Sequence, residues 1–85
     1  MEYFDRLMGG PLDGKKSRST YQRGYFPSVV GIQLVEAGFD FIGVYAHERS
    51  EISGDSTDRI YQYVRSMPIQ EGHDYVVTNS RNKAD

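Results

Sequence analysis

The sequence predicts an all-β fold, arranged as a small twisted antiparallel sheet or partly open barrel of about four or five strands. β-Branched and aromatic residues gather in short runs at 29–36, 39–47 and 59–65, as they do in strands. Glycine, proline and small polar residues separate these runs, which is typical of turns between strands. The alternative is an α+β fold with one short helix, at 28–37 or at 56–67.

The chain length sets the domain organisation. Its 85 residues leave room for one core, so we expect a single domain over residues 1–79 and a flexible C-terminal tail over residues 80–85. The hydrophobic share of 38% lies within the globular range. The sequence holds no cysteine, no apolar run long enough to span a bilayer and no signal-peptide pattern, which predicts a soluble, cytoplasmic protein.

The N-terminal elements are short. Residues 2–8 mix aromatic and apolar side chains with charges and precede Gly9-Gly10-Pro11, which predicts a first strand ended by a turn. Residues 15–22 are polar and rich in serine and threonine, which indicates a loop or a ragged strand. Tyr25 and Phe26 lie between a glycine and a proline, so we expect them to anchor the chain.

The central segment predicts a hairpin. Residues 29–36 form one strand, Ala37-Gly38 the tight turn, and residues 39–47 the returning strand. In the returning strand Phe39, Phe41 and Tyr45 share one face while Ile42 and Val44 share the other, which predicts a central strand. The alternative is a helix over 29–37, capped by Ser28 and ended by Gly38, but three valines and an internal glycine form helices poorly.

The C-terminal half continues the pattern. Residues 47–58 are polar and predict a long hairpin loop, after which 59–65 form a strand that Pro68 ends. A helix capped by Ser56 or Thr57 is the competing interpretation of this run. Residues 75–78 predict one more short strand.

The stretch GGPLDGKKS approaches the phosphate-binding P-loop pattern. Gly9, Gly14 and Lys15 have the required spacing, but Lys16 stands where the magnesium-binding hydroxyl belongs and Ser17 comes one residue late. The segment that follows has little helical pattern, so no helix N-terminus is expected to face a phosphate. The residues favour a compound turn instead, in which the glycines adopt positive φ.

GGPLDG follows a short N-terminal strand, and a Tyr-x-Tyr pattern lies within Arg59 to Val64. In these features the chain resembles small uncharacterised proteins encoded in phages, prophages and bacterial genomes. The matching parts are Tyr3 to Gly14 and, more loosely, Val44-Tyr45 with Arg59 to Val64. The resemblance implies an all-β fold and a phage accessory role, and it supplies no activity.

Cations interleaved with aromatic residues form the candidate binding site of the sequence. Its members are Lys15, Lys16, Arg18, Tyr21, Arg23 and Tyr25. This combination can bind phosphates and stack bases, but four charges are few and the pI of 5.6 opposes a polyanion, so nucleic acid is not expected. Residues 36–74 carry eight acids against three arginines, so the two regions can attract each other in the fold or face water separately.

The acidic region predicts no metal site. Glu48, Glu51, Asp55 and Asp58, with His47, do not match the spacing of a calcium loop. Without cysteine, with two histidines and with no nucleophile elbow, the chain also lacks an assembled catalytic set. We therefore expect no enzyme activity, no metal and no cofactor.

The expected function is protein binding. The basic-aromatic segment, the acidic loop or a sheet edge would face a protein partner, and the phage resemblance implies a host or defence protein. A second copy of the chain is another candidate partner, whereas a membrane is not expected. The alternative function is the binding of a small anionic ligand, such as a nucleotide, by the glycine-rich turn and the basic segment.

Overall fold

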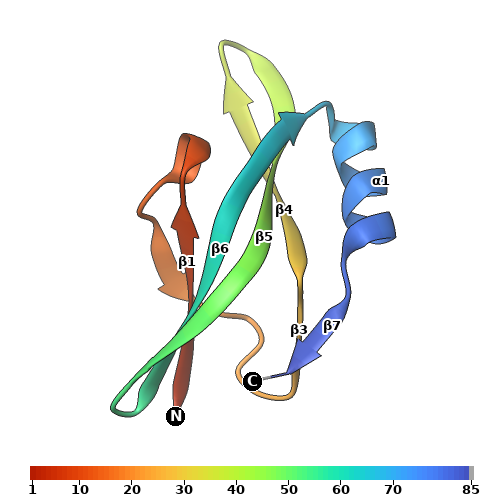
Figure 1. Cartoon of the computed structure of the whole chain (residues 1–85). Coiled ribbons are helices and arrows are strands. Elements are labelled where there is room, and N and C mark those ends of the chain that lie inside the picture. Colours follow the sequence, from red (N-terminus) through yellow and green to blue (C-terminus); the bar gives the residue numbers. More distant parts are fainter. Residues whose placement is uncertain (85) are drawn as a thin grey trace.

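The computed structural model describes residues 1–84 and consists mostly of strands, with one α-helix (Figure 1). In chain order the elements are β1 (Glu2–Met8), the 3₁₀ helix η1 (Gly10–Leu12), β2 (Lys16–Arg18), β3 (Tyr25–Pro27), β4 (Val29–Glu36), β5 (Phe39–Ser53), β6 (Ser56–Met67), α1 (Ile69–Asn79) and β7 (Asn82–Ala84).

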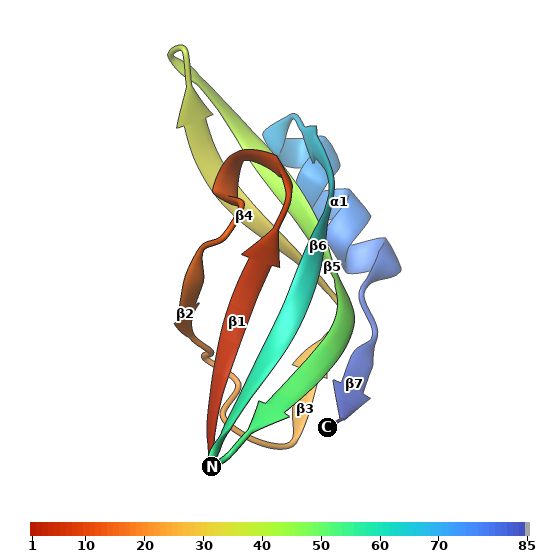
Figure 2. The same ribbon diagram turned by 60° about the vertical axis from the view of Figure 1, so that its left-hand side comes forward.

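The main sheet has five strands in the order β2-β1-β6-β5-β4, and a separate two-stranded sheet pairs β3 with β7. The ribbon views show that the main sheet is strongly twisted and curled (Figures 1 and 2). The expected antiparallel pairing holds for β1 with β2, β4 with β5 and β5 with β6, whereas β1 and β6 run parallel. No short turn joins these two strands, so their direction is not constrained as it is in a hairpin.

The predicted central hairpin is confirmed. β4 pairs with β5 over Val29–Glu36, and Ala37 and Gly38 form the turn with φ values of 52° and 80°. Positive φ at both turn residues matches the right-handed twist of the strands. β5 lies between β4 and β6, so the prediction of a central strand that is apolar on both faces is also confirmed.

The helix lies at neither of the two places proposed for it. Residues 28–37 and 56–67 are mainly strand, and α1 instead covers Ile69–Asn79, including the strand expected at 75–78. Pro68 directly precedes the helix, and Ile69, Tyr75 and Val76 pack on the sheet. Gly72 concealed this pattern because glycine forms helices poorly, yet it is buried where the helix approaches Ile42.

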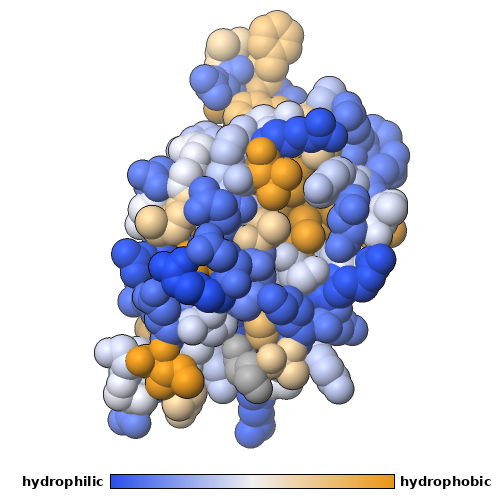
Figure 3. All heavy atoms as spheres, viewed as in Figure 1, coloured by the Kyte–Doolittle hydropathy of each residue, from blue (hydrophilic) through white to orange (hydrophobic). Residues whose placement is uncertain are grey.

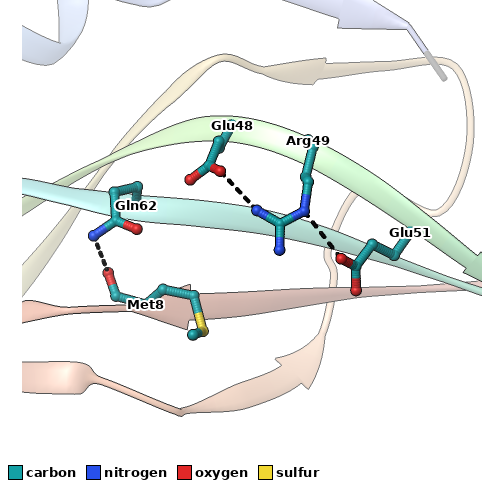
Figure 4. Close-up of polar contacts among 5 residues, drawn as sticks. All are labelled: Met8, Glu48, Arg49, Glu51 and Gln62. Atoms are coloured by element: carbon teal, nitrogen blue, oxygen red, sulfur yellow. Dashed lines mark hydrogen bonds and ion pairs between the residues drawn. The ribbon is translucent and has the colours of Figure 1, made fainter.

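The loop expected over residues 47–58 is mostly strand. β5 continues to Ser53, and only Gly54 and Asp55 turn the chain into β6, with Gly54 at φ 59°. Charge pairing makes this polar stretch compatible with a strand. Arg49 donates to Glu48 at 2.6 Å and to Glu51 at 3.0 Å along the exposed face of β5 (Figure 4).

Two small cores lie on opposite faces of the sheet. On the helix face the buried residues are Val29, Ile42, Val44 and Met67. On the other face, which we call the loop face, they are Leu7, Phe26, Tyr45 and Tyr61. Adjacent residues such as Val29 and Val30 pack into different cores, because side chains alternate between the two faces of a strand.

Part of the segment expected as a C-terminal tail contacts the rest of the chain. Asn82–Ala84 form β7 and pair with β3, and Ser28 receives a hydrogen bond from the Arg81 amide at 2.7 Å. Asp85, the last residue of the predicted tail, lies outside the described residues. Among residues 1–84, no helix combines the length and apolar character that crossing a bilayer requires.

Candidate functional site

The glycine-rich turn uses its own backbone donors. Five backbone amides of the turn donate hydrogen bonds to other groups of the protein, namely those of Gly9, Leu12, Asp13, Gly14 and Lys15. The Gly9 amide, for example, donates to Asp13 Oδ1 at 2.6 Å. The Asp13 carboxylate therefore occupies one of the amide donors that a phosphate would need.

The same turn is fixed to the core. The hydroxyl of the buried Tyr45 accepts a hydrogen bond from the Leu12 amide at 3.1 Å and donates to the Gly9 carbonyl at 2.9 Å. Gly9, Gly10 and Gly14 all have positive φ, and Lys16 begins strand β2 rather than a helix. The predicted compound turn is confirmed, and its geometry gives no support to an anion cradle.

The six sequence-predicted site residues do not converge. We call residues 15–25 the basic loop. Lys16 forms an ion pair with Asp58 at 3.1 Å and lies 4.8 Å from the Phe4 ring, so the expected attraction between basic and acidic regions is confirmed for this pair. Lys15, Arg18, Arg23 and Tyr25 are exposed, and of the six only Tyr21 lines a cavity.

A buried arginine holds the basic loop against the sheet. Arg59 is fully buried, and its guanidinium carbon lies 4.3 Å from the ring centroids of both Tyr3 and Phe26. It donates to Ser19 Oγ at 3.2 Å and to the Tyr21 carbonyl. Sequence analysis missed this residue. Arg59 directly precedes Ile60 in a β-favouring run and lies two residues before Tyr61, so Arg59 and Tyr61 share one face of the strand. This alternation could have indicated that Arg59 faces inward.

Gln22 adds a second attachment of the basic loop. Its side-chain amide donates to the carbonyls of Tyr3 at 2.9 Å and Ser19 at 2.7 Å, and its Oε1 accepts from the Tyr3 amide at 3.2 Å. The polar groups of this segment thus serve the fold, which leaves its exposed cations as a dispersed surface.

The basic loop borders a partly open cavity of about 160 Å³ on the loop face, which we call the loop cavity. It is lined by Asp5, Leu7, Ser17, Thr20, Tyr21, Val30, Ile32 and Tyr61. Ser17 of β2 and Ile32 of β4 meet at this cavity although three strands separate β2 from β4 in the sheet. The loop face is therefore the inner face of the curl.

Asp5 supplies the carboxyl group in the lining of the loop cavity. Burial raises the pKa of its carboxyl above the ordinary value, against the smaller lowering effects of a hydrogen bond from Ser19 and of the Arg59 charge. Within the described part of the chain, Asp5 Oδ1 is shielded from solvent and has no hydrogen-bond partner. Such an oxygen is uncommon in folded proteins.

The second surface feature is the end of the β4–β5 hairpin. β5 first pairs with β6 at Ile42, so residues 33–41, which we call the arm, extend past β6. Val35 and Phe39 on the arm are 70% and 76% exposed. Figure 3 shows apolar atoms at this end, standing clear of the rest of the molecule. An open hollow of about 330 Å³, the tip hollow, is lined by Glu36, Ala37, Phe41 and Ser66.

The acidic region forms no candidate metal centre in residues 1–84, where no group of three or more histidine or carboxylate side chains is placed to hold an ion. Glu48 and Glu51 instead flank Arg49, and beside them Gln62 donates to the Met8 carbonyl at 3.1 Å (Figure 4). These contacts pair the polar side chains on this exposed part of the outer face of the curl.

Comparison with known proteins found no matching family model, no matching curated protein and no matching solved structure.

Proposed function

We propose that the protein is a non-enzymatic binding protein that docks on a protein partner through the arm. The observation that carries the proposal is the exposure of Val35 and Phe39 on a hairpin that extends past the sheet. A two-stranded hairpin is marginally stable alone in water, and apolar side chains at its end gain free energy when a partner covers them.

The arm continues the inner face of the sheet. Val30 and Ile32 pack against the loop-face core, and the next residue on that face, Leu34, pairs with Phe41. Phe39 extends the same row on β5. An apolar row that begins in a core and continues into solvent is the kind of surface that a partner protein covers.

Charge indicates the chemistry of the partner. Residues 33–41 include Glu36 and Asp40 and no basic residue. The partner surface that fits them is apolar, with lysine or arginine at its rim. The tip hollow beside Phe41 has room for an apolar side chain from that partner.

The cellular setting is part of the proposal. The resemblance of the GGPLDG segment to phage-encoded proteins supports an accessory role with a host protein as the partner. The absence of cysteine from the chain favours the cytoplasm as the compartment. Protein docking also requires no catalytic group, in keeping with a non-enzymatic role.

Photo-crosslinking in the native cell tests this function. A photoreactive phenylalanine analogue replaces Phe39 in one variant and Ile52, at the tip of the opposite hairpin, in the control variant. Ile52 is a matched control because it is an apolar residue with 73% exposure, close to the 76% of Phe39. We expect one heterologous adduct from position 39 and none from position 52.

Binding measurements with the crosslinked partner then give the magnitude. Burying a phenylalanine side chain is worth about 2 kcal/mol, so Phe39→Ser is expected to weaken binding about 30-fold, and Ile52→Ser to leave it unchanged. An adduct between two copies of the chain would contradict a heterologous partner and would show that the arm forms a homodimer. Equal crosslinking from both positions would overturn the arm as the docking surface.

A further inference from the structure

β4 is the end strand of the main sheet, so among residues 1–84 one of its two backbone edges has no neighbouring strand (Figures 1 and 2). Consecutive residues of a strand direct their N–H and C=O groups to opposite sides. The His47 amide in β5 donates to the carbonyl of Ser28, just before β4, at 2.7 Å, so the even-numbered residues of β4 face β5. The odd-numbered residues face the other side, where the Val29 amide donates to Ser80 Oγ at 3.3 Å.

Beyond Val29 the outward groups are those of Gly31, Gln33 and Val35, which we call the free edge. Within residues 1–84 no group of the chain forms a hydrogen bond with the N–H or C=O of these residues. All three residues are exposed, and because Gly31 has no side chain, its exposed surface is backbone. The free edge therefore presents a row of unpaired backbone donors and acceptors.

The two end strands of the main sheet differ in how they are protected against pairing with another strand. At the opposite end, β2 has three residues, and Lys16 and Arg18 among them are charged. Short length and charged side chains are common means by which proteins keep sheet edges from pairing. β4 has eight residues, and residues 29–35 include no charge, no proline and no register shift against β5. The free edge is thus open to another strand.

We propose that the protein partner adds an extended segment along the free edge, as a sixth strand beside the five of the main sheet. This inference rests on the proposed docking through the arm and specifies how the partner binds there. Gly31, Gln33 and Val35 each pair with one residue of that segment through their N–H and C=O groups. In strand addition of this kind, backbone hydrogen bonds give affinity and alternate side chains give specificity.

The side chains around the free edge define the chemistry of the added segment. On the inner face Val30, Ile32 and Leu34 are half-buried and present an apolar row to the segment. Every second residue of the segment is therefore apolar. Near the end of the arm, Glu36 and Asp40 favour a lysine or arginine. A second copy of the chain fits less well, because its arm brings the same two acids and no basic residue.

Amide hydrogen exchange followed by NMR, residue by residue, tests the strand addition. In the free protein we expect fast exchange at Gly31, Gln33 and Val35, and slower exchange at Ile32 and Leu34, whose amides face β5. The bound state is the complex with the protein that crosslinks from position 39. In that complex the three fast amides are expected to slow by at least about tenfold.

A proline at position 33 tests the same edge by binding. Gln33→Pro removes one outward N–H, and a sheet tolerates proline on an edge strand where that N–H faces solvent. Gln33→Ala is the matched control, because it removes the side chain and keeps the N–H. We expect Gln33→Pro to bind the crosslinked partner at least about tenfold more weakly than Gln33→Ala does. The exchange pattern comes from the unaltered chain, so it does not depend on the folding of the proline variant.

Slower exchange at all three amides of the free edge in the complex, with the larger loss of binding in Gln33→Pro, supports strand addition. A complex in which these amides still exchange fast, or equal binding of the two variants, would overturn strand addition and leave docking through the arm standing.

Two results for the protein alone would also overturn the proposal. Slow exchange of the three amides at low protein concentration would show that the edge is already covered. Protection that grows with protein concentration would assign the edge to a second copy of the chain. The absence of any adduct from position 39 is a different failure, because it overturns the proposed function and with it this inference.

Discussion

Replacing single glycines of the compound turn by alanine measures how closely the turn packs on the sheet. A Cβ added to Gly10 would lie 2.4 Å from Tyr63 Cγ and 2.5 Å from Cδ1. A Cβ added to Gly14 would meet no atom within 4 Å. Both glycines have positive φ, at 64° and 82°, so the two variants share the backbone cost and differ in the clash.

The magnitudes follow from this difference. An alanine in the left-handed region costs about 1 kcal/mol, and this is the expected loss of unfolding free energy for Gly14→Ala. Gly10→Ala adds an overpacking cost of about 2 kcal/mol. The Tyr63 ring cannot move away freely, because it packs 5.4 Å from the Tyr45 ring and its hydroxyl bonds to Ser66 at 2.8 Å.

Thermal unfolding followed by circular dichroism is the assay. For a domain of this size, 1 kcal/mol corresponds to about 6 °C, so we expect Tm to fall by about 6 °C for Gly14→Ala and about 18 °C for Gly10→Ala. Equal losses in the two variants would refute the close contact between Gly10 and Tyr63. An unchanged Tm in both would refute the turn geometry itself.

Three further predictions concern the interior. Gly72→Ala should lower the unfolding free energy by about 1 to 2 kcal/mol, because the added Cβ would lie 2.4 Å from Ile42 Cβ and the overpacking cost exceeds the gain in helix propensity. Urea unfolding measures this loss. A variant more stable than wild type would contradict the tight packing of the helix. Arg59→Met should lower the unfolding free energy by about 3 kcal/mol and speed amide exchange at residues 19–22. The control Arg65→Met, at an exposed position, should change both little. Equal losses of unfolding free energy in the two variants would contradict the attachment of the basic loop by Arg59. Because the pKa of Asp5 is raised in the folded state, the folded protein holds that proton more tightly than the unfolded chain, so this group lowers stability as pH rises from about 4 through the folded pKa. Asp5→Asn should remove this contribution, and urea midpoints that fail to rise relative to wild type between about pH 4 and pH 7 would contradict it.

Local patterns predicted the strands and turns that local chemistry determines. Ala37-Gly38 between two β-branched runs indicated the hairpin, and the alternation of Phe39, Phe41 and Tyr45 with Ile42 and Val44 identified the two faces of β5. The glycines of GGPLDG indicated a compound turn for the same reason, since few other residues adopt positive φ.

Long-range contacts decided what the sequence patterns missed. Pairing of β1 with β6 joins segments more than 50 residues apart, for which no local pattern exists. The glycine at position 72 made a helix look unfavourable in the sequence. A glycine is needed there because the helix approaches Ile42 closely, which only the fold reveals. Arginine is usually a surface residue, and the burial of Arg59 depends on the Tyr3 and Phe26 rings and on its hydrogen bonds to the basic loop, all of which come from distant segments.

The candidate sites divide in the same way. Clustering in sequence identified the six basic-loop residues, but the fold places Arg18 and Lys16 on the face opposite the loop cavity and brings only Tyr21 to its lining. Asp5, Val30 and Ile32 come from β1 and β4, so their proximity depends on the curl of the sheet. The exposed arm could have been inferred only from knowing where β6 ends.

Hydrogen exchange of the protein with and without the partner identified by crosslinking tests the docking surface most directly. Protection should increase at residues 33–41 and stay unchanged across the basic loop. Protection confined to residues 15–25, with the arm exchanging as in the free protein, would contradict docking through the arm.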